Sequence, residues 1–263
     1  MQGNRNRRYR DKPARSGLAH DVIVAGRKPS LQLLISAPQR IREVYIREEV
    51  QLIKELEGPL SQLPQHIPIT KLDKAQLSEL SEGVDTQGIA MRVAPAPNVD
   101  LADLIALSRS RRGVLLIIDQ VEDPQNFGAI LRSAEALGAD GVIATIRHTA
   151  PATAAMRRAS MGASEIIPLC RVNSLQRTIK LLKESGYWIL GTTLEDRTVS
   201  ISKCDLSLPL ALIVGSESTG LRRLTTENCD FCVHIPLRGT MQSLNVAQAT
   251  SILLYEILRH FDS

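Results

Sequence analysis

The chain has 263 residues, of which 43% are hydrophobic and 23% are charged, the usage of an ordinary globular protein. This composition excludes a chain that is disordered throughout, and no run of 18 apolar residues is present to span a membrane. The first twenty residues lack the apolar core of a secretory signal, and four cysteines are too few for a disulfide scaffold in a chain this long. We therefore expect a cytoplasmic protein with no membrane partner.

The positive charge is concentrated at the N-terminus. Residues 1–20 hold six basic side chains and one acidic one, a net charge of +5, whereas the whole chain carries only +4. A basic, disordered tail of this kind binds polyanions without reading their sequence, or it serves only to solubilise the chain. A mitochondrial transit peptide is a third interpretation, which the absence of an amphipathic apolar face disfavours.

Residues 21–94 predict a small α/β domain of alternating short strands and helices. The expected strands are Val22–Ala25, Arg42–Arg47, Ile67–Lys71 and Gly88–Val93, and the expected helices begin at Pro29 and cover residues 48–57 and Lys74–Leu80. The Pro-rich stretch Ala94–Asn98 then predicts a domain boundary. We expect a linker over residues 95–113, which carries a basic patch at Arg109, Arg111 and Arg112.

Residues 114–263 predict a second, larger α/β domain. Continuous apolar runs are expected as strands at Val114–Ile118, Gly141–Thr145, Trp188–Leu190, Leu210–Val214 and Cys232–Ile235, and helices at Asn126–Leu137, Ala152–Met161, Leu175–Lys183 and Val246–Phe261. Such runs are typical of a parallel sheet that is covered on both faces. Ligands bind such sheets at the carboxyl ends of the strands, so the segments that follow the strands are the candidates for chemistry.

The first candidate segment runs from Asp119 to Arg132. Asn126 stands where it could cap the helix that follows the strand. An arginine on a helix is usually a solvated charge, but the neighbours Ile130, Leu131 and Ala134 are apolar, which makes a partly buried, directed guanidinium plausible for Arg132. The alternative of an ordinary surface ion pair stays open at this point.

The second candidate segment, Leu212–Leu221, places Gly215 and Gly220 around a short polar loop that follows a buried strand. Glycine permits positive φ angles or the close approach of backbone to a ligand. The loop is neither a Walker A motif nor a dinucleotide fingerprint. Glu217 could bind a ribose hydroxyl, or it could simply occupy the first turn of a helix, which the helix dipole favours.

The third candidate segment, His234–Ala247, leads from a strand into the last helix. Ser243 or Asn245 would serve as an N-cap in any protein, but a pocket shared with the second segment is also expected. The pair Cys229-x-x-Cys232 lacks the further ligands that a zinc site needs, so we expect no metal.

These three segments, in this order, resemble the three motifs of the SpoU (TrmH-like) RNA ribose 2′-O-methyltransferases. The matching residues are Asp123-Pro-Gln-Asn126-Phe-Gly-x-x-x-Arg132, then Gly215-Ser-Glu217-Ser-Thr-Gly220-Leu221-Arg222, then Ile235-Pro236-Leu-Arg-Gly239 followed by Ser243-Leu244-Asn245-Val246. The resemblance covers residues 22–263 and is similar to the branch that methylates a guanosine of 23S ribosomal RNA. It implies a trefoil-knotted parallel-sheet (SPOUT) methyltransferase domain at 114–263, a ribosomal-protein-like substrate-binding domain at 21–94, and a homodimer.

The resemblance also implies the cofactor and the site residues. The methyl donor would be S-adenosylmethionine, held by backbone at Thr192, Gly215, Ile235 and Leu244. The catalytic set would be Arg132, Asn126, Glu217, Ser243 and Asn245. A tRNA methyltransferase of the same fold and a non-catalytic RNA-binding protein are the alternatives, whereas a nicotinamide-dependent dehydrogenase lacks its glycine fingerprint.

Two segments depart from the family pattern in the expected substrate-binding domain. Gly26-Arg27-Lys28-Pro29 stands where relatives often have Gly-x-His-Ala, and Thr86-Gln87-Gly88 stands where they have His-Gln-Gly. In the second motif, Ser218 replaces the usual glycine. The departures concern the RNA target more than the methyl transfer.

Overall fold

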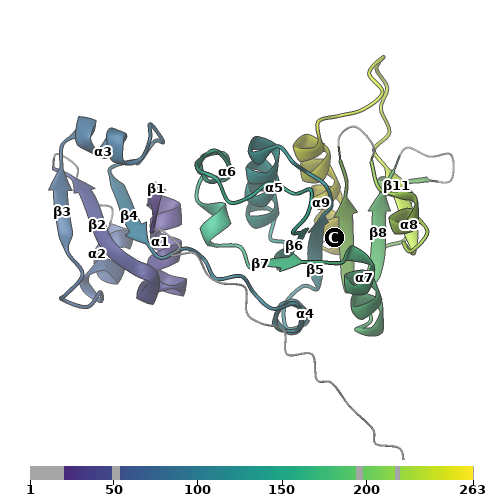
Figure 1. The fold of residues 1–263 in the computed structure, drawn as a ribbon, viewed down its shortest axis with the longest axis horizontal. Helices are drawn as coiled ribbons and strands as arrows, with labels where there is room; N and C mark the ends of the chain where they lie inside the picture. Colours follow the sequence, from purple (N-terminus) through teal and green to yellow (C-terminus); the bar gives the residue numbers. More distant parts are fainter. Residues whose placement is uncertain (1–20, 49–53, 194–197, 217–219, 263) are drawn as a thin grey trace, which may run out of the picture.

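The computed structural model describes residues 21–48, 54–193, 198–216 and 220–262, which form two domains side by side, each built on its own sheet (Figure 1). The expected basic tail and Glu217 lie outside the described residues.

The N-terminal domain has a four-stranded sheet in the order β1-β4-β2-β3. Its elements are β1 (Val22–Ala25), α1 (Arg27–Ser36), the 3-10 helix η1 (Pro38–Arg40), β2 (Ile41–Arg47), α2 (Lys54–Ser61), β3 (Ile69–Leu72), α3 (Lys74–Leu80) and β4 (Ile89–Val93). Strand β4 pairs antiparallel with β1 and β2, and β3 pairs parallel with β2. Helices α1 and α2 contribute to one core and α3 to a second, smaller one, so both faces of the sheet are covered.

The predicted elements of this domain are present with shifted bounds. Strand β1 and helix α3 coincide with the expected ranges, and Asp73 starts α3 with a capping box. Strand β3 begins at Ile69 rather than Ile67, because Ile67 closes a turn onto Pro64 and Pro68 has no N–H to donate. The helix expected at 48–57 is described from Lys54 to Ser61.

The C-terminal domain has a seven-stranded sheet in which every pair is parallel, in the order β7-β6-β5-β10-β8-β11-β9. Its strands are β5 (Val114–Ile118), β6 (Gly141–Thr145), β7 (Leu169–Val172), β8 (Trp188–Thr192), β9 (Val199–Ser200), β10 (Leu210–Val214) and β11 (Phe231–His234). Its helices are α4 (Leu101–Arg109), α5 (Pro124–Ala136), α6 (Ala154–Ser160), α7 (Leu175–Glu184), α8 (Arg223–Thr226) and α9 (Val246–Asp262), with 3-10 turns η2 (Ala163–Glu165) and η3 (Ile201–Lys203).

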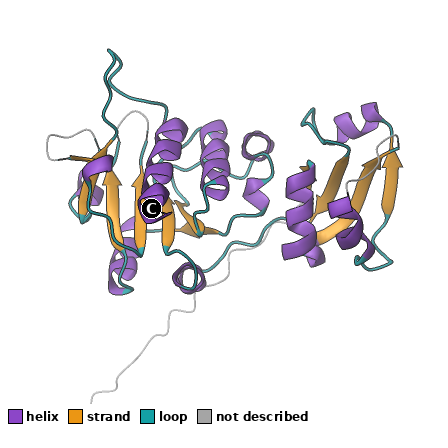
Figure 2. Cartoon of the chain, turned by 180° about the vertical axis from the view of Figure 1, so that it is seen from behind, coloured by secondary structure: helices purple, strands orange, loops and turns teal. Residues whose placement is uncertain are grey.

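Both faces of this sheet are buried, as the continuous apolar runs predict. Along β5, Leu116 and Ile118 point into the core formed with α5 and α9, whereas Leu115 and Ile117 point into the core formed with α4 and α7. Figures 1 and 2 show these helix pairs on opposite sides of the sheet. The prediction of a doubly covered parallel sheet is confirmed.

Short elements were not expected from the sequence. Strands β7 and β9 and helices α4 and α8 have between two and nine residues, too few for a decisive hydrophobic period. Within the segment expected as a linker, Leu104 on α4 is fully buried in the second core. The guanidinium of Arg171 on β7 lies 4.9 Å from the ring centroid of Phe127 and donates to the carbonyl of Ala150 at 2.9 Å.

Helices α5 and α6 approach each other closely at Gly128. A Cβ at this position would lie 2.3 Å from the carbonyl oxygen of Met156 and 2.7 Å from Cβ of Ala159. Both distances are shorter than van der Waals contact, so only glycine permits this packing.

We therefore expect Gly128→Ala to lower the free energy of unfolding by about 1–3 kcal/mol, the usual cost of overpacking a core. Gly239→Ala is the control in the same domain, because a Cβ there meets nothing within 4 Å, and it should change the stability by less than about 0.5 kcal/mol. Denaturant unfolding of both variants measures the difference. Equal stability of the two variants would contradict the tight packing.

Candidate functional site

A cavity of about 560 Å³ opens at the carboxyl ends of three neighbouring strands. Thr192 ends β8, Gly215 follows β10, and Ile235 follows β11. Leu244 and Ser243 come from the segment that precedes α9. The full lining is Thr192, Thr193, Val214, Gly215, Ser216, Gly220, Leu221, Val233, His234, Ile235, Leu237, Gln242, Ser243, Leu244, Val246, Ala249 and Leu253. The fold thus brings the four residues expected to hold the cofactor into one cavity.

The loop after β10 folds back on itself at its two glycines. A Cβ on Gly215 would lie 2.5 Å from the carbonyl oxygen of Gly220, so the two backbones can only meet without a side chain. The N–H of Gly220 donates to the carbonyl of Ser216 at 2.9 Å, and Gly220 has φ +62°. Of the two reasons that the sequence offered for glycine, the positive φ angle is present at Gly220, whereas the close approach at Gly215 is to the backbone of Gly220 and the approach to a ligand stays a prediction.

Asp119 contacts the segments on both sides of this loop. Its N–H donates to the carbonyl of Val214, which precedes the loop, at 2.9 Å. Its carboxylate oxygens both accept from Nη2 of Arg222, which follows the loop, at 3.2 Å. Asp119 opens the first candidate segment and Arg222 stands in the second motif, but neither was predicted as a site residue. The available signal was that Asp119 is the first polar residue after a wholly apolar strand.

Burial raises the pKa of the Asp119 carboxyl, and the neighbouring charge of Arg222 opposes that rise only in part. The carboxylate side chain is only 1% exposed, whereas the Arg222 side chain is half exposed. Ionised Asp119 is therefore held in place at a cost in desolvation.

Two of the expected catalytic side chains are in contact. Nδ2 of Asn245 donates to Oδ1 of Asn126 at 3.0 Å, which joins the entrance of α9 to the first turn of α5. Oδ1 of Asn245 accepts the N–H of Ala247 at 2.9 Å, so Asn245 caps α9, one of the two residues that the sequence offered for that role. The expectation that Asn126 caps α5 is wrong. Asp123 does so, accepting the N–H of Gln125 at 3.0 Å, because the helix begins at Pro124, two residues before the expected start.

Arg132 lies on α5 but does not line the cavity. Its side chain is exposed, so it is not the partly buried group that its apolar neighbours made plausible. Ile130, Leu131 and Ala134 turn inward and leave Arg132 on the outer face of the helix. Within the described residues no hydrogen bond or ion pair is found for its guanidinium. A permanently charged group in this state is available to an anion from outside the chain.

Helices α5 and α9 run side by side in the same direction. The candidates of the first motif, on α5, therefore lie near those of the third motif, at the start of α9. After the Asn126–Asn245 contact, Oγ of Ser133 meets Oγ of Ser251 at 2.7 Å about two turns further along both helices. Arg132 therefore lies beside the seam between α5 and α9. Ser243 lies before α9 and is exposed at the cavity.

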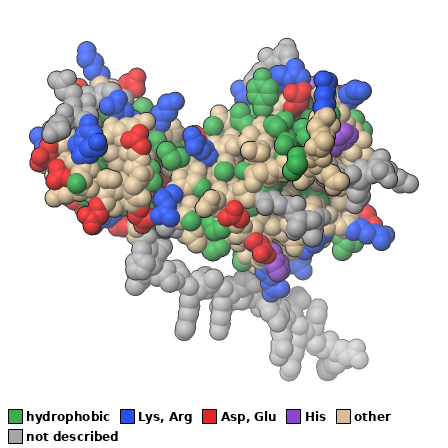
Figure 3. All heavy atoms as spheres, turned by 90° about the horizontal axis from the view of Figure 1, so that it is seen from above, with side chains coloured by type: hydrophobic (Ala, Val, Ile, Leu, Met, Phe, Trp, Pro, Cys, Tyr) green, Lys and Arg blue, Asp and Glu red, His purple; other side chains and the backbone are tan. Residues whose placement is uncertain are grey.

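The two segments that depart from the family pattern contact each other. The N–H of Arg27 donates to Oε1 of Gln87 at 3.1 Å, and Nε of Arg27 donates to the carbonyl of Gln87 at 3.1 Å. Both departures thus belong to one edge of the N-terminal domain, at the start of α1 and before β4. Figure 3 shows that Lys and Arg side chains are interspersed with Asp and Glu on the visible surface of both domains.

Metal ligands are not assembled in the described part of the chain, where no three His, Cys, Asp or Glu side chains lie together in a suitable group. Burial raises the pKa of the Cys229 thiol to about 12, which keeps it protonated at neutral pH. Among the described helices, none has the length and apolar content to cross a membrane.

The chain is similar to known proteins over both domains. The profile of the SpoU rRNA Methylase family matches residues 113–255, and that of the RNA 2′-O ribose methyltransferase substrate-binding domain matches residues 23–99. The 23S rRNA (guanosine-2′-O-)-methyltransferase RlmB of Coxiella burnetii is 41% identical over 86% of this chain and 91% of its own. RlmB of Salmonella typhimurium is 42% identical over 86% of this chain and 93% of its own. The AdoMet-bound rRNA methyltransferase of Sinorhizobium meliloti superposes with a TM-score of 0.70 at 25% identity, over 93% of this chain and 89% of that one.

The raised pKa of Asp119 has a consequence for stability. When a carboxyl has a higher pKa in the folded than in the unfolded state, the folded protein loses stability as the pH rises. The loss begins near the pKa of the unfolded state, 3.8, and is complete above the pKa of the folded state. Asp119→Asn has no such loss, so we expect it to be more stable than the unsubstituted protein at pH 7, with a difference that shrinks as the pH falls.

Denaturant unfolding between pH 4 and pH 7 measures this difference. Glu227→Gln removes one partner of a surface ion pair with Arg223 and should change the stability by less than about 0.5 kcal/mol at every pH. A variant Asp119→Asn that is less stable at neutral pH would show that the contact with Arg222 outweighs desolvation.

Proposed function

This chain belongs to the SpoU rRNA methylase family, and from that membership we propose that it methylates the ribose 2′-hydroxyl of a guanosine in 23S rRNA, with S-adenosylmethionine as methyl donor. The observation that carries the proposal is the match to relatives named for this reaction, at about 40% identity over both domains. A protein that only bound RNA would have no need of a cavity lined as this one is. Methylation of a tRNA ribose is the alternative, and a methyl-transfer assay on each RNA distinguishes the two substrates.

The cavity suits an amphiphilic cofactor of this size. Its volume lies within the range of about 300–1,000 Å³ that is typical of small-molecule sites. Leu221, Val233 and Leu244 offer apolar surface to an adenine ring, while Thr192 and Ser216 offer polar groups to a ribose and an amino acid. When bound, S-adenosylmethionine supplies an electrophilic methyl group.

Arg132 is the residue we assign to the RNA backbone and to the developing charge. A neutral hydroxyl attacks slowly unless its oxygen gains negative charge, and a cation nearby stabilises that charge. A guanidinium keeps its proton in proteins, so Arg132 acts as a charge and a hydrogen-bond donor rather than as a general base. Its exposed position leaves it accessible to a phosphate of the RNA.

The remaining candidates arrange the site around that arginine. The Asn126–Asn245 contact fixes the start of α5 against the start of α9. Ser243 lines the cavity, and we assign it to holding the substrate, as the motif resemblance implies. Glu217, in the sequence that follows β10, lies outside the described residues, and its role stays a prediction.

The proposal extends to the assembly and the chain path. The matched ranges, 23–99 and 113–255, support a substrate-binding domain at 21–94 and a methyltransferase domain at 114–263, and we propose residues 95–113 as their connection, in which α4 packs against the larger domain. We propose a homodimer through the C-terminal domain, supported by the exposed Ile252 and Tyr255 on α9, and a trefoil knot in that domain. Light scattering after gel filtration tests the dimer. A cytoplasmic location follows from a ribosomal substrate.

Methyl transfer from labelled S-adenosylmethionine to unmodified 23S rRNA and, separately, to tRNA tests the function. Alkaline hydrolysis then maps the product, since a 2′-O-methyl group blocks cleavage at its nucleotide. We expect one protected guanosine in 23S rRNA. Label in tRNA alone would keep the chemistry and replace the substrate, and no label in either RNA would refute the proposal.

We expect Arg132→Lys to lower kcat about 10²–10³-fold, because the ammonium keeps the charge but loses the planar fork that binds and stabilises oxygen anions. Affinity for S-adenosylmethionine, measured by calorimetry, should stay unchanged, since Arg132 does not line the cavity. Arg177→Lys on α7, an exposed arginine on the other face of the sheet, is the matched control and should be fully active. Normal turnover of Arg132→Lys would remove the arginine from the mechanism.

A further inference from the structure

The two domains are joined through one buried carboxylate. Glu165 ends η2 in the C-terminal domain, and its side chain is 8% exposed. Its Oε2 accepts from Nη2 of Arg40 at 2.6 Å and from the N–H of Ala96 at 2.9 Å. Arg40 belongs to η1 of the N-terminal domain and Ala96 to the segment between the domains. A single oxygen therefore binds the other domain and the connection to it.

All three guanidinium nitrogens of Arg40 donate hydrogen bonds in this contact. Besides the ion pair, Nη1 donates to the backbone carbonyl of Glu165 at 2.7 Å, and Nε donates to the carbonyl of Ala94 at 2.9 Å. The planar fork thus meets three acceptors in fixed directions. A buried pair of this kind adds little net stability over apolar packing, but its directed hydrogen bonds favour one arrangement of the parts that it joins.

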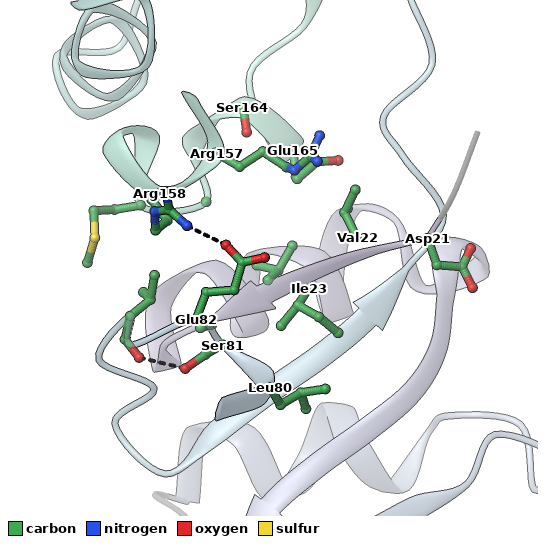
Figure 4. Close-up of a pocket in the computed structure, with 15 residues that line it drawn as sticks. Asp21, Val22, Ile23, Leu80, Ser81, Glu82, Arg157, Arg158, Ser164 and Glu165 are labelled. Carbon is green, nitrogen blue, oxygen red and sulfur yellow. Dashed lines mark hydrogen bonds and ion pairs between the residues drawn. The ribbon is translucent and has the colours of Figure 1, made fainter. Parts of the chain in front are cut away.

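The surrounding surfaces fit this arrangement. Gly162 has φ +89°, and a Cβ there would lie 2.7 Å from Cβ of Pro29 at the start of α1. A small cavity of about 170 Å³ separates the domains nearby. Figure 4 shows Glu165 on one wall of this cavity and Val22 on the other, with the exposed pair Arg158–Glu82 across it.

The carboxylate is attached to the part of the C-terminal domain that carries Arg132. Helix α6 and η2 both pack against α5, and Gly128 allows α5 and α6 to touch. Glu165 and Arg132 therefore belong to one tightly packed unit of three short elements. The orientation of the N-terminal domain is set relative to that unit.

We propose that Glu165 is a positioning residue for the RNA: by fixing the N-terminal domain and the linker on the α5–α6–η2 unit, it determines which nucleotide reaches Arg132 and the cavity. The inference rests on the proposed function, because it assigns to the N-terminal domain the binding of the RNA that the C-terminal domain methylates. Contacts between the RNA and the N-terminal domain then determine which nucleotide lies at the cavity of the C-terminal domain.

The test is Glu165→Gln in the full chain. Glutamine keeps the shape of the side chain but removes its negative charge, so the ion pair with Arg40 is lost. Its amide N–H₂ group is also a donor, and it would lie beside the two donors, Arg40 and the N–H of Ala96, that now bind the carboxylate. We expect unchanged affinity for S-adenosylmethionine and a kcat/KM for 23S rRNA lower by about 100-fold, the effect of a small misplacement of reacting groups. Methylation should also spread to further nucleotides, and small-angle X-ray scattering should show a larger radius of gyration.

Glu82→Gln is the matched control. It also removes a carboxylate that pairs with an arginine across the domains, but both side chains of that pair are about half exposed. Exposed pairs contribute little, so this variant should methylate the same nucleotide as the unsubstituted protein at the same rate. Arg40→Gln removes the other partner of the buried pair and should reproduce the effect of Glu165→Gln.

The outcomes separate the inference from the proposed function. Methylation of the same guanosine at an undiminished rate by Glu165→Gln overturns the role of Glu165, and so does a loss of activity that is accompanied by a loss of cofactor affinity. An unsubstituted protein that methylates no nucleotide of 23S rRNA refutes the proposed function instead. Lost target selectivity with intact cofactor binding, absent from Glu82→Gln, supports the inference.

Discussion

The hydrogen bonds that pair β10 with β5 on one side and with β8 on the other bring the candidate site together. Val214 pairs with Ile118 and Ile213 with Gly191, so the segments that follow these strands leave the sheet at one edge. Parallel strands all present their carboxyl ends to the same side. Residues that are 103 positions apart in the chain, Asp119 and Arg222, therefore become neighbours. The cavity, the Gly215–Gly220 loop and the capped start of α9 all depend on this register.

The site is divided between a cavity whose described lining holds no Asp, Glu, Lys or Arg and an exposed cation outside it. The cavity is lined mainly by glycine backbone, aliphatic side chains and hydroxyl groups, together with His234 and Gln242, and this mixed lining suits a cofactor with apolar and polar parts. Arg132 stays outside on α5, where water solvates it until an anion arrives. This separation avoids burying an unpaired charge, which would cost several kcal/mol. The seam between α5 and α9, fixed by Asn126 with Asn245 and by Ser133 with Ser251, holds the two parts in relation.

Charged pairs differ in what they do in this molecule. The Arg223–Glu227 and Arg158–Glu82 pairs are exposed, and water competes with each partner. Arg40 with Glu165 and Asp119 with Arg222 instead involve a buried carboxylate, so each must be satisfied by specific donors. One of these joins the domains and the other joins two strand ends across the cavity loop. Burial turns an ordinary ion pair into a geometric constraint.

Much of the fold and part of the site follow from the sequence, because their signals are local. Apolar runs at β5, β6 and β10 mark strands that are buried on both faces, and Gly215, Gly220 and Asn245 occupy positions whose backbone demands those residue types. Motif resemblance placed Thr192, Ile235 and Leu244, which the structure then gathers around one cavity. Helix α4 and strands β7 and β9 escaped prediction, because their few residues carry no clear period.

Only the tertiary structure decided the rest. The exposure of Arg132 depends on which face of α5 meets the core, and the roles of Asp119, Arg222, Arg40 and Glu165 depend on partners more than 100 residues away in the chain. Asp123 caps α5, in place of the expected Asn126, because the helix begins at Pro124, earlier than its apolar pattern indicates. The sequence by itself determined the elements and the chemistry of the motifs, since these rest on local backbone preference and residue type. The tertiary structure decided which charges meet, since ion pairing depends on distance in space and on exclusion of water.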